Sequence, residues 1–154
     1  MNNKIKILLT LSVLFISGSQ SFAQKPNYAG TWVLNLEKSK LDSPPEGLTS
    51  SEFIITQEGD KFKLTIYHIF GKKRKKISFK MTADGKTRKV KLLFKGKLEW
   101  KGDTLQATLW RKNFLNIVSY KFGDNQNEFI ADEVFTGKPK DHHSIWVFDR
   151  DNSK

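Results

Sequence analysis

The stretch Lys61–Phe70, KFKLTIYHIF, alternates between apolar and polar side chains along its whole length. One side of the alternation carries Phe62, Leu64, Ile66, His68 and Phe70, and the other carries Lys61, Lys63, Thr65 and Tyr67. Successive side chains of a β-strand point to opposite faces, so this pattern predicts a strand with one buried face.

The same alternation recurs on both sides of this stretch. Apolar residues two positions apart occur at Phe53 and Ile55, at Ile77, Phe79 and Met81, at Val90, Leu92 and Phe94, at Leu98 and Trp100, and at Leu105, Ala107 and Leu109. Residues 115–122, 128–135 and 144–149 are rich in β-branched and aromatic residues, which predicts strands, but their two faces are not separated by polarity.

Glycine-containing turn signals separate these segments and predict hairpins. They lie at Gly59, Gly71, Gly85, Gly96, Gly102, Gly123 and Gly137. No stretch shows the spacing of an amphipathic helix, and the only long irregular segment is 37–49, which contains Pro44 and Pro45. We therefore predict an all-β fold with little helix: an antiparallel up-and-down barrel of 8–10 strands, in which closure removes exposed sheet edges.

Composition limits the class of protein. The chain has 154 residues, no Cys, a formal net charge of +11, and 38% hydrophobic residues, which suits one globular domain. The lack of Cys excludes disulfides, thiolate zinc sites and a cysteine nucleophile.

The first residues have the pattern of a secretory signal. Lys4 and Lys6 precede a short apolar run at 7–16, and a small-x-small cleavage pattern ends at Ala23. The apolar run is too short for a spanning helix, which needs about 20 residues. We expect residues 1–23 to be a signal peptide and 24–154 to be a single domain in the periplasm or outside the cell, without a transmembrane segment.

Two short motifs near the ends of the predicted domain carry a resemblance. They are Gly30-Thr31-Trp32, continued by Asn35 and Ser39-Lys40, and Phe148-Asp149-Arg150. These motifs resemble those of the calycin superfamily, which includes lipocalins and fatty-acid-binding proteins, and are most similar to those of secreted bacterial lipocalin-like proteins. The resemblance implies a lipocalin-like barrel, often with a cavity for a small apolar molecule. It also implies that Arg150 packs over Trp32 and closes the barrel, with Gly30 as the third residue of this closure.

The chain departs from this superfamily in three respects. It lacks the C-terminal helix of larger lipocalins, a cysteine bridge, and the helix pair that follows the first strand of fatty-acid-binding proteins. These departures leave the class of ligand open.

Three polar residues are candidate contacts for a ligand inside the barrel. His68 lies on an apolar face, where it is either a ligand contact or a hydrogen-bonded core residue. Arg111 continues the face of Leu109, and if it points inward it needs an anion such as Glu133 or a ligand carboxylate; alternatively it is solvated. Tyr120 either contacts the same head group or belongs to the core.

A basic hairpin supports an alternative function. Its cations are Lys72, Lys73, Arg74, Lys75 and Lys76. Such a cluster can attract an anionic envelope surface or a protein partner, although solubility or protection of a strand edge is the commoner use. Nucleic acid is not expected, because the predicted location is outside the cytoplasm and no stacking platform accompanies the cations.

The sequence shows no catalytic or cofactor-binding motif. His142 and His143 are adjacent and point to opposite faces of a strand, so they cannot chelate a metal together. We expect no metal, no cofactor and no enzymatic activity, while an unrecognised hydrolase remains a third hypothesis.

One further alternative is a lumen filled by aromatic side chains, namely Phe53, Phe62, Phe70, Phe79, Phe94 and Trp100.

Overall fold

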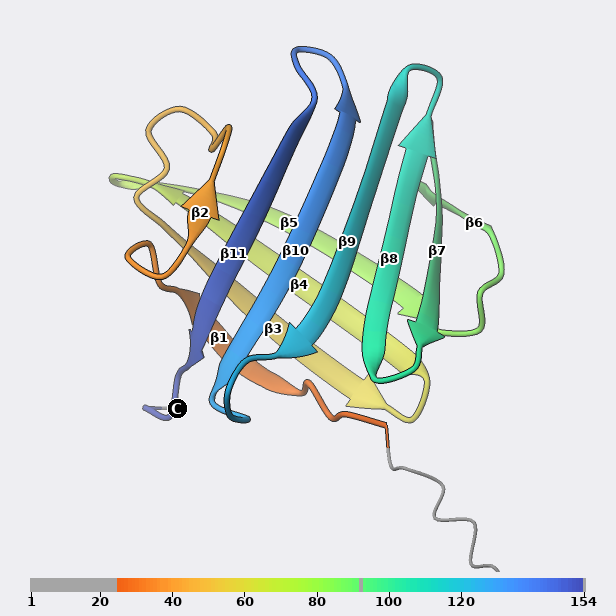
Figure 1. The fold of residues 1–154 in the computed structure, drawn as a ribbon, viewed down its shortest axis with the longest axis horizontal. Helices are drawn as coiled ribbons and strands as arrows, with labels where there is room; N and C mark the ends of the chain where they lie inside the picture. Colours follow the sequence, from red (N-terminus) through yellow and green to blue (C-terminus); the bar gives the residue numbers. More distant parts are fainter. Residues whose placement is uncertain (1–24, 92, 154) are drawn as a thin grey trace, which may run out of the picture.

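The computed structural model describes residues 25–91 and 93–153; the predicted signal peptide lies outside them. Every helix-or-strand element in these ranges is a strand (Figure 1). The bounds are β1 Gly30–Leu34, β2 Lys40–Leu41, β3 Ser50–Glu58, β4 Lys61–Phe70, β5 Lys73–Thr82, β6 Arg88–Lys91, β7 Phe94–Lys101, β8 Thr104–Arg111, β9 Phe114–Phe122, β10 Glu128–Gly137 and β11 His142–Arg150.

The strands form one antiparallel sheet that curls into a nearly closed barrel. Its order is β5-β4-β3-β1-β11-β10-β9-β8-β7-β6, and β2 pairs with β11 beside this path. In Figure 1 the layer formed by β11, β10, β9 and β8 lies across the layer formed by β3, β4 and β5. The predicted all-β up-and-down barrel is therefore confirmed, with one difference: β5 and β6 are the two ends of the sheet, so closure leaves two edges.

The strand register follows the alternation in the sequence. Ile66 of β4 lies opposite Phe53 of β3 and Ile77 of β5, so apolar side chains of three strands meet on the same face. The β3–β4 and β4–β5 hairpins turn at Gly59 and Gly71, each with a φ of 57°. Glycine adopts this conformation without the steric cost of a side chain, and it suits the tight turns that fix hairpin register.

The sequence prediction is wrong around Gly96. Val90, Leu92 and Phe94 were expected on one strand followed by a turn at Gly96, but β6 ends at Lys91 and β7 begins at Phe94. Gly96 lies inside β7, where a Cβ would come within 2.7 Å of Val90 Cγ2. This glycine therefore permits close packing between strands, which local sequence does not distinguish from a turn.

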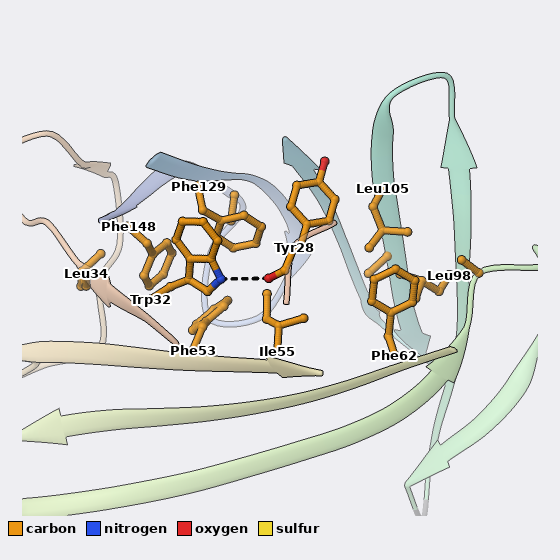
Figure 2. Close-up of a cluster of buried hydrophobic side chains, with 13 residues drawn as sticks. Tyr28, Trp32, Leu34, Phe53, Ile55, Phe62, Leu98, Leu105, Phe129 and Phe148 are labelled. Atoms are coloured by element: carbon orange, nitrogen blue, oxygen red, sulfur yellow. Dashed lines mark hydrogen bonds between the residues drawn. The ribbon is translucent and has the colours of Figure 1, made fainter. Parts of the chain in front are cut away.

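One end of the barrel interior is filled by aromatic rings (Figure 2). This aromatic end consists of Trp32, Phe53, Phe129 and Phe148. The ring centroids of Trp32 and Phe129 are 5.3 Å apart, and those of Phe53 and Phe148 are 4.4 Å apart. Trp32 is fully buried, and its indole Nε1 donates a 3.0 Å hydrogen bond to the carbonyl of Tyr28, so no polar group of the ring is left unpaired.

Arg150 seals the seam between β1 and β11. Its guanidinium lies 4.1 Å from the centroid of the Trp32 ring, and its Nη1 donates to the carbonyl of Ala29 at 3.1 Å. Gly30 has a φ of 141°, and a Cβ at this position would lie 2.6 Å from Arg150 Nη1. The pair is the one that the resemblance implies, and the glycine beside it gives the guanidinium room.

The segment between β1 and β3 is a hydrogen-bonded loop. Ser39 Oγ donates to the carbonyl of Asn35 at 2.6 Å and accepts from the amide of Val147 at 2.9 Å, which holds the segment against β11. The short strand β2 adds to this pairing, with Leu41 opposite Ser144. Side chains from the same loop line the barrel interior farther along, at Ser43 and Pro45.

Candidate functional site

The barrel encloses a cavity of about 710 Å³. Its wall is mostly apolar and includes Ile55, Phe62, Leu64, Ile66, Leu105 and Val118. Phe53, Phe79 and Phe94 also line this space, so the alternative in which aromatic side chains fill the lumen is wrong. A cavity of this size and polarity is typical of small-molecule sites.

Glu133 is the central polar group of the cavity wall. Asn116 Nδ2 donates to its Oε1 at 2.7 Å, and Trp146 Nε1 donates to its Oε2 at 2.8 Å. The side chain of Glu133 is only 17% exposed. Each carboxylate oxygen therefore has one protein donor, which offsets part of the cost of placing a charge in the barrel.

The strand register explains why these side chains meet. Glu133 of β10 lies opposite Val118 of β9 and Ser144 of β11. Asn116 and Trp146 are each two positions along from those partners, on the same inward face. Such diagonal neighbours are within reach of long side chains, so the contact follows from the barrel register.

Asn116 also presents an unused acceptor. Its Oδ1 is buried and has no hydrogen-bond partner among the described residues. Native proteins leave few buried polar atoms unsatisfied, and such an atom beside a cavity is explained by a partner such as an ordered water or a ligand. The free oxygen is on the amide that holds Glu133, so the two acceptors share one place on the wall.

Two histidines also line the cavity. His142 stacks on Phe135 with centroids 4.6 Å apart, and its Nε2 lies 4.0 Å from Glu133 Oε2. His68 is across the lumen on β4, where its Nδ1 is 3.1 Å from the buried hydroxyl of Ser51. Burial, assisted by the positive charge of Lys75, lowers the pKa of His68, which keeps this imidazole neutral near pH 7. With Glu133 and Asn116, these two histidines form what we term the polar end of the cavity.

Tyr120 belongs to the cavity wall and stays protonated. Burial, and then the charge of Glu133, raises the pKa of its phenol well above the usual range. Its ring stacks on Phe129 with centroids 5.5 Å apart. Tyr120 therefore packs against the aromatic end, and its contact with a ligand head group stays a prediction.

Arg111 lies outside the group that lines the cavity. Its guanidinium is 4.9 Å from the ring centroid of Phe94 and 5.7 Å from that of Phe114, and the residue is exposed. The inward ion pair with Glu133 does not form, because β8 ends at Arg111 and the side chain reaches the rim. Glu133 takes its hydrogen bonds from Asn116 and Trp146 instead.

The basic hairpin is divided between two environments. Arg74 forms an ion pair with Glu52 and lies over the ring of Tyr67, 3.6 Å from its centroid. Lys75 and Lys76 line the cavity, although both are exposed to solvent. Binding of the hairpin to anionic surfaces stays a prediction.

No group of three or more metal-ligating side chains gathers within residues 25–91 and 93–153. His142 and His143 do lie on opposite faces, since His143 Nε2 contacts Asp132 Oδ1 at 2.8 Å, away from the cavity-lining His142. The described part of the chain also has no helix with the length and hydropathy to cross a bilayer.

The sequence alone does not indicate Asn116, His142 and Trp146 as members of the site, and it suggests Glu133 only as a partner for Arg111. The sequence does contain a sign that Glu133 points inward. Side chains two positions apart on a strand share a face, and Glu133 shares one with Phe129, Ala131 and Phe135. This sign is obscured because β9, β10 and β11 carry apolar residues on both faces. An inward carboxylate in such a strand is visible only once one face is known to be buried.

Comparisons with known proteins address the fold. No protein-family model and no curated protein matches the sequence. Among solved structures, the abundant heat soluble (SAHS) protein of Ramazzottius varieornatus is similar, with a TM-score of 0.59, 16% identity, and coverage of 80% of this chain and 95% of that one.

Two binding proteins show a comparable similarity. Fatty-acid-binding protein 1 of Echinococcus granulosus has a TM-score of 0.55 at 14% identity, covering 80% of this chain and 96% of that one. The zebrafish ileal bile acid-binding protein, solved with cholic acid, has a TM-score of 0.54 at 14% identity, covering 80% and 98%. At these identities the similarity is one of architecture, and it shows that the chain has a calycin-like fold.

Proposed function

We propose that this protein binds a small apolar or amphipathic molecule inside its barrel. The observation that carries the proposal is the cavity of about 710 Å³, whose wall is mostly apolar and includes the polar groups of Glu133, Asn116, His68 and His142. Burial of an apolar ligand there is favourable at roughly 25 cal/mol per Å² of surface removed from water. The polar end would orient the ligand.

The architecture supports this function over catalysis. Proteins of similar fold include one named for fatty-acid binding and one solved with cholic acid, so the barrel is suited to holding amphipathic molecules. We propose a binding role rather than an enzymatic one, since the described residues gather no metal-ligating group and the serine hydroxyl beside His68, that of Ser51, is fully buried.

The proposal is tested by titration with N-phenyl-1-naphthylamine, a neutral apolar dye that fluoresces when it leaves water. Wild-type protein should bind the dye with saturation. Leu64→Trp places an indole in the lumen and should weaken binding by about tenfold or more, which is about 1.4 kcal/mol.

Lys63→Trp is the matched control, because Lys63 is the exposed neighbour of Leu64 on β4 and points away from the lumen. It should leave the affinity unchanged. Circular dichroism of both variants checks that the sheet is intact. Equal dye binding by both tryptophan variants, or none by folded wild-type protein, would contradict the proposal.

We also propose that the protein is exported and acts in the periplasm or outside the cell. The basic start, the apolar run and the cleavage pattern at Ala23 support this location. Fractionation of the native host followed by N-terminal sequencing tests it: a mature chain that begins at Gln24 is expected, and an unprocessed cytoplasmic chain would refute it.

A further inference from the structure

Glu133 and Asn116 at the polar end of the cavity have acceptor capacity that no group of the described residues uses. Glu133 already receives one hydrogen bond on each oxygen, from Asn116 and Trp146, and a carboxylate oxygen can accept more than one. The adjacent Asn116 Oδ1 is buried and unpartnered within the described residues. The Asn116 amide and the Trp146 indole thus both donate to Glu133, while acceptor capacity is left over on Glu133 and on Asn116.

We propose that the polar group of the ligand is a hydrogen-bond donor, a protonated amine or an alcohol, and that Glu133 and Asn116 accept from it. This inference rests on the proposed binding function and adds the chemical class of the ligand. A protonated amine is favoured most, because it gives a charge-assisted hydrogen bond to Glu133 and can also donate to Asn116 Oδ1. A carboxylate brings neither a donor nor a compatible charge.

The other ionisable groups around the lumen are consistent with this choice. His68 is held neutral by burial, so it adds no cation opposite Glu133. His142 Nε2 is 4.0 Å from Glu133 Oε2, beyond hydrogen-bond distance. Lys75, Lys76 and Lys91 are the cavity-lining cations that could attract a carboxylate, but all three are exposed, where water and salt weaken their field.

The experiment compares three ligands with the same twelve-carbon chain: dodecylamine, dodecanol and dodecanoate. Each displaces N-phenyl-1-naphthylamine from full-length mature protein at pH 7.4, below its micelle concentration. Dodecylamine should bind at least about tenfold more tightly than dodecanoate, with dodecanol between them.

Glu133→Gln keeps the size of the side chain and removes its charge. It should abolish most of the preference for the amine over the carboxylate and change dodecanol affinity less. Asp132→Asn is the matched control, since it also removes one negative charge from β10. Asp132 precedes Glu133 and contacts His143 on the outer face. This variant should keep the wild-type order, as should Lys75→Gln. Asn116→Ser, a second variant, should weaken amine and alcohol together.

The outcomes separate this inference from the proposed function. If all three ligands bind and dodecanoate is the tightest, the barrel binds amphiphiles but the donor preference is wrong. If the order is unchanged in folded Glu133→Gln, Glu133 does not select the ligand and the inference also fails. If neither the dye nor any ligand binds folded protein, both proposals are wrong.

Discussion

The two ends of the barrel interior use the same inward positions for opposite purposes. At the aromatic end, Trp32, Phe129 and Phe148 fill the space between the layers and are almost fully buried. At the polar end, Glu133 and Asn116 occupy equivalent inward positions, but space remains beside them. The contrast shows that period-two alternation specifies a barrel face, while the size and polarity of the inward residues decide whether that face packs or binds.

The largest expected effect tests the packing half of this contrast. Trp32→Ala should lower the free energy of unfolding by about 3–5 kcal/mol, because it empties a fully buried site and removes the partner of Arg150. Urea denaturation measures the loss. Trp146→Ala at the polar end should cost clearly less, since that indole already borders open space; equal losses would erase the distinction between the ends.

A smaller effect is expected at the seam. Gly30→Ala should destabilise the protein by about 1–3 kcal/mol, because its φ of 141° is strained for alanine and the new Cβ would displace the guanidinium of Arg150. Thermal unfolding checks this. Gly47→Ala is a useful comparison, as its φ of 73° is also positive but no atom lies within 4 Å of an added Cβ. If the two variants lose the same stability, strain alone explains Gly30.

His68 at the polar end should make the stability of the protein depend on pH. The pKa of His68 is lowered by folding from an ordinary value of 6.5, so the unfolded chain binds more protons just below that pH. Its contribution to stability is therefore complete above pH 6.5 and is lost as the pH falls towards the folded pKa. His68→Asn should flatten this part of the profile, measured by urea denaturation between pH 5 and 8. An unchanged slope would mean that burial does not disfavour the charged ring.

The smallest effect is expected at the rim. Arg111→Gln removes a cation from the faces of Phe94 and Phe114 and should cost less than about 1 kcal/mol, because the guanidinium is exposed. Dye affinity and the order of the three twelve-carbon ligands should not change. A change in the affinity for dodecanoate relative to the other two ligands would place Arg111 in the binding site.

Much of the fold could be predicted from the sequence because a strand with one polar face displays its orientation directly. The stretch Lys61–Phe70 is such a strand in its sequence, and β5 follows the same rule at Ile77, Phe79 and Met81. The site was harder to predict, since its main residues lie on β9, β10 and β11, where both faces carry apolar side chains. Glu133 meets Asn116 only through the register of two adjacent strands, and a linear pattern contains no register.

The end of β8 shows a second reason why the sequence did not predict every position correctly. Arg111 continues an inward face by parity, but a strand terminus lets a long side chain leave that face and lie on the rim. Gly96 shows a third reason. A glycine that makes room for a neighbouring side chain cannot be distinguished in the sequence from a glycine that forms a turn. Both are tertiary effects, and neither leaves a mark in local composition.

The incomplete closure of the barrel gives the positive charge of this chain a structural meaning. Both strands at the ends of the sheet are strongly cationic: β5 carries Lys73, Arg74, Lys75, Lys76 and Lys80, and β6 carries Arg88, Lys89 and Lys91. A second molecule that approached with its own β5 or β6 would meet like charges, most densely at residues 73–76 and 88–91. The composition thus opposes fibril growth at the two places where the backbone could template it.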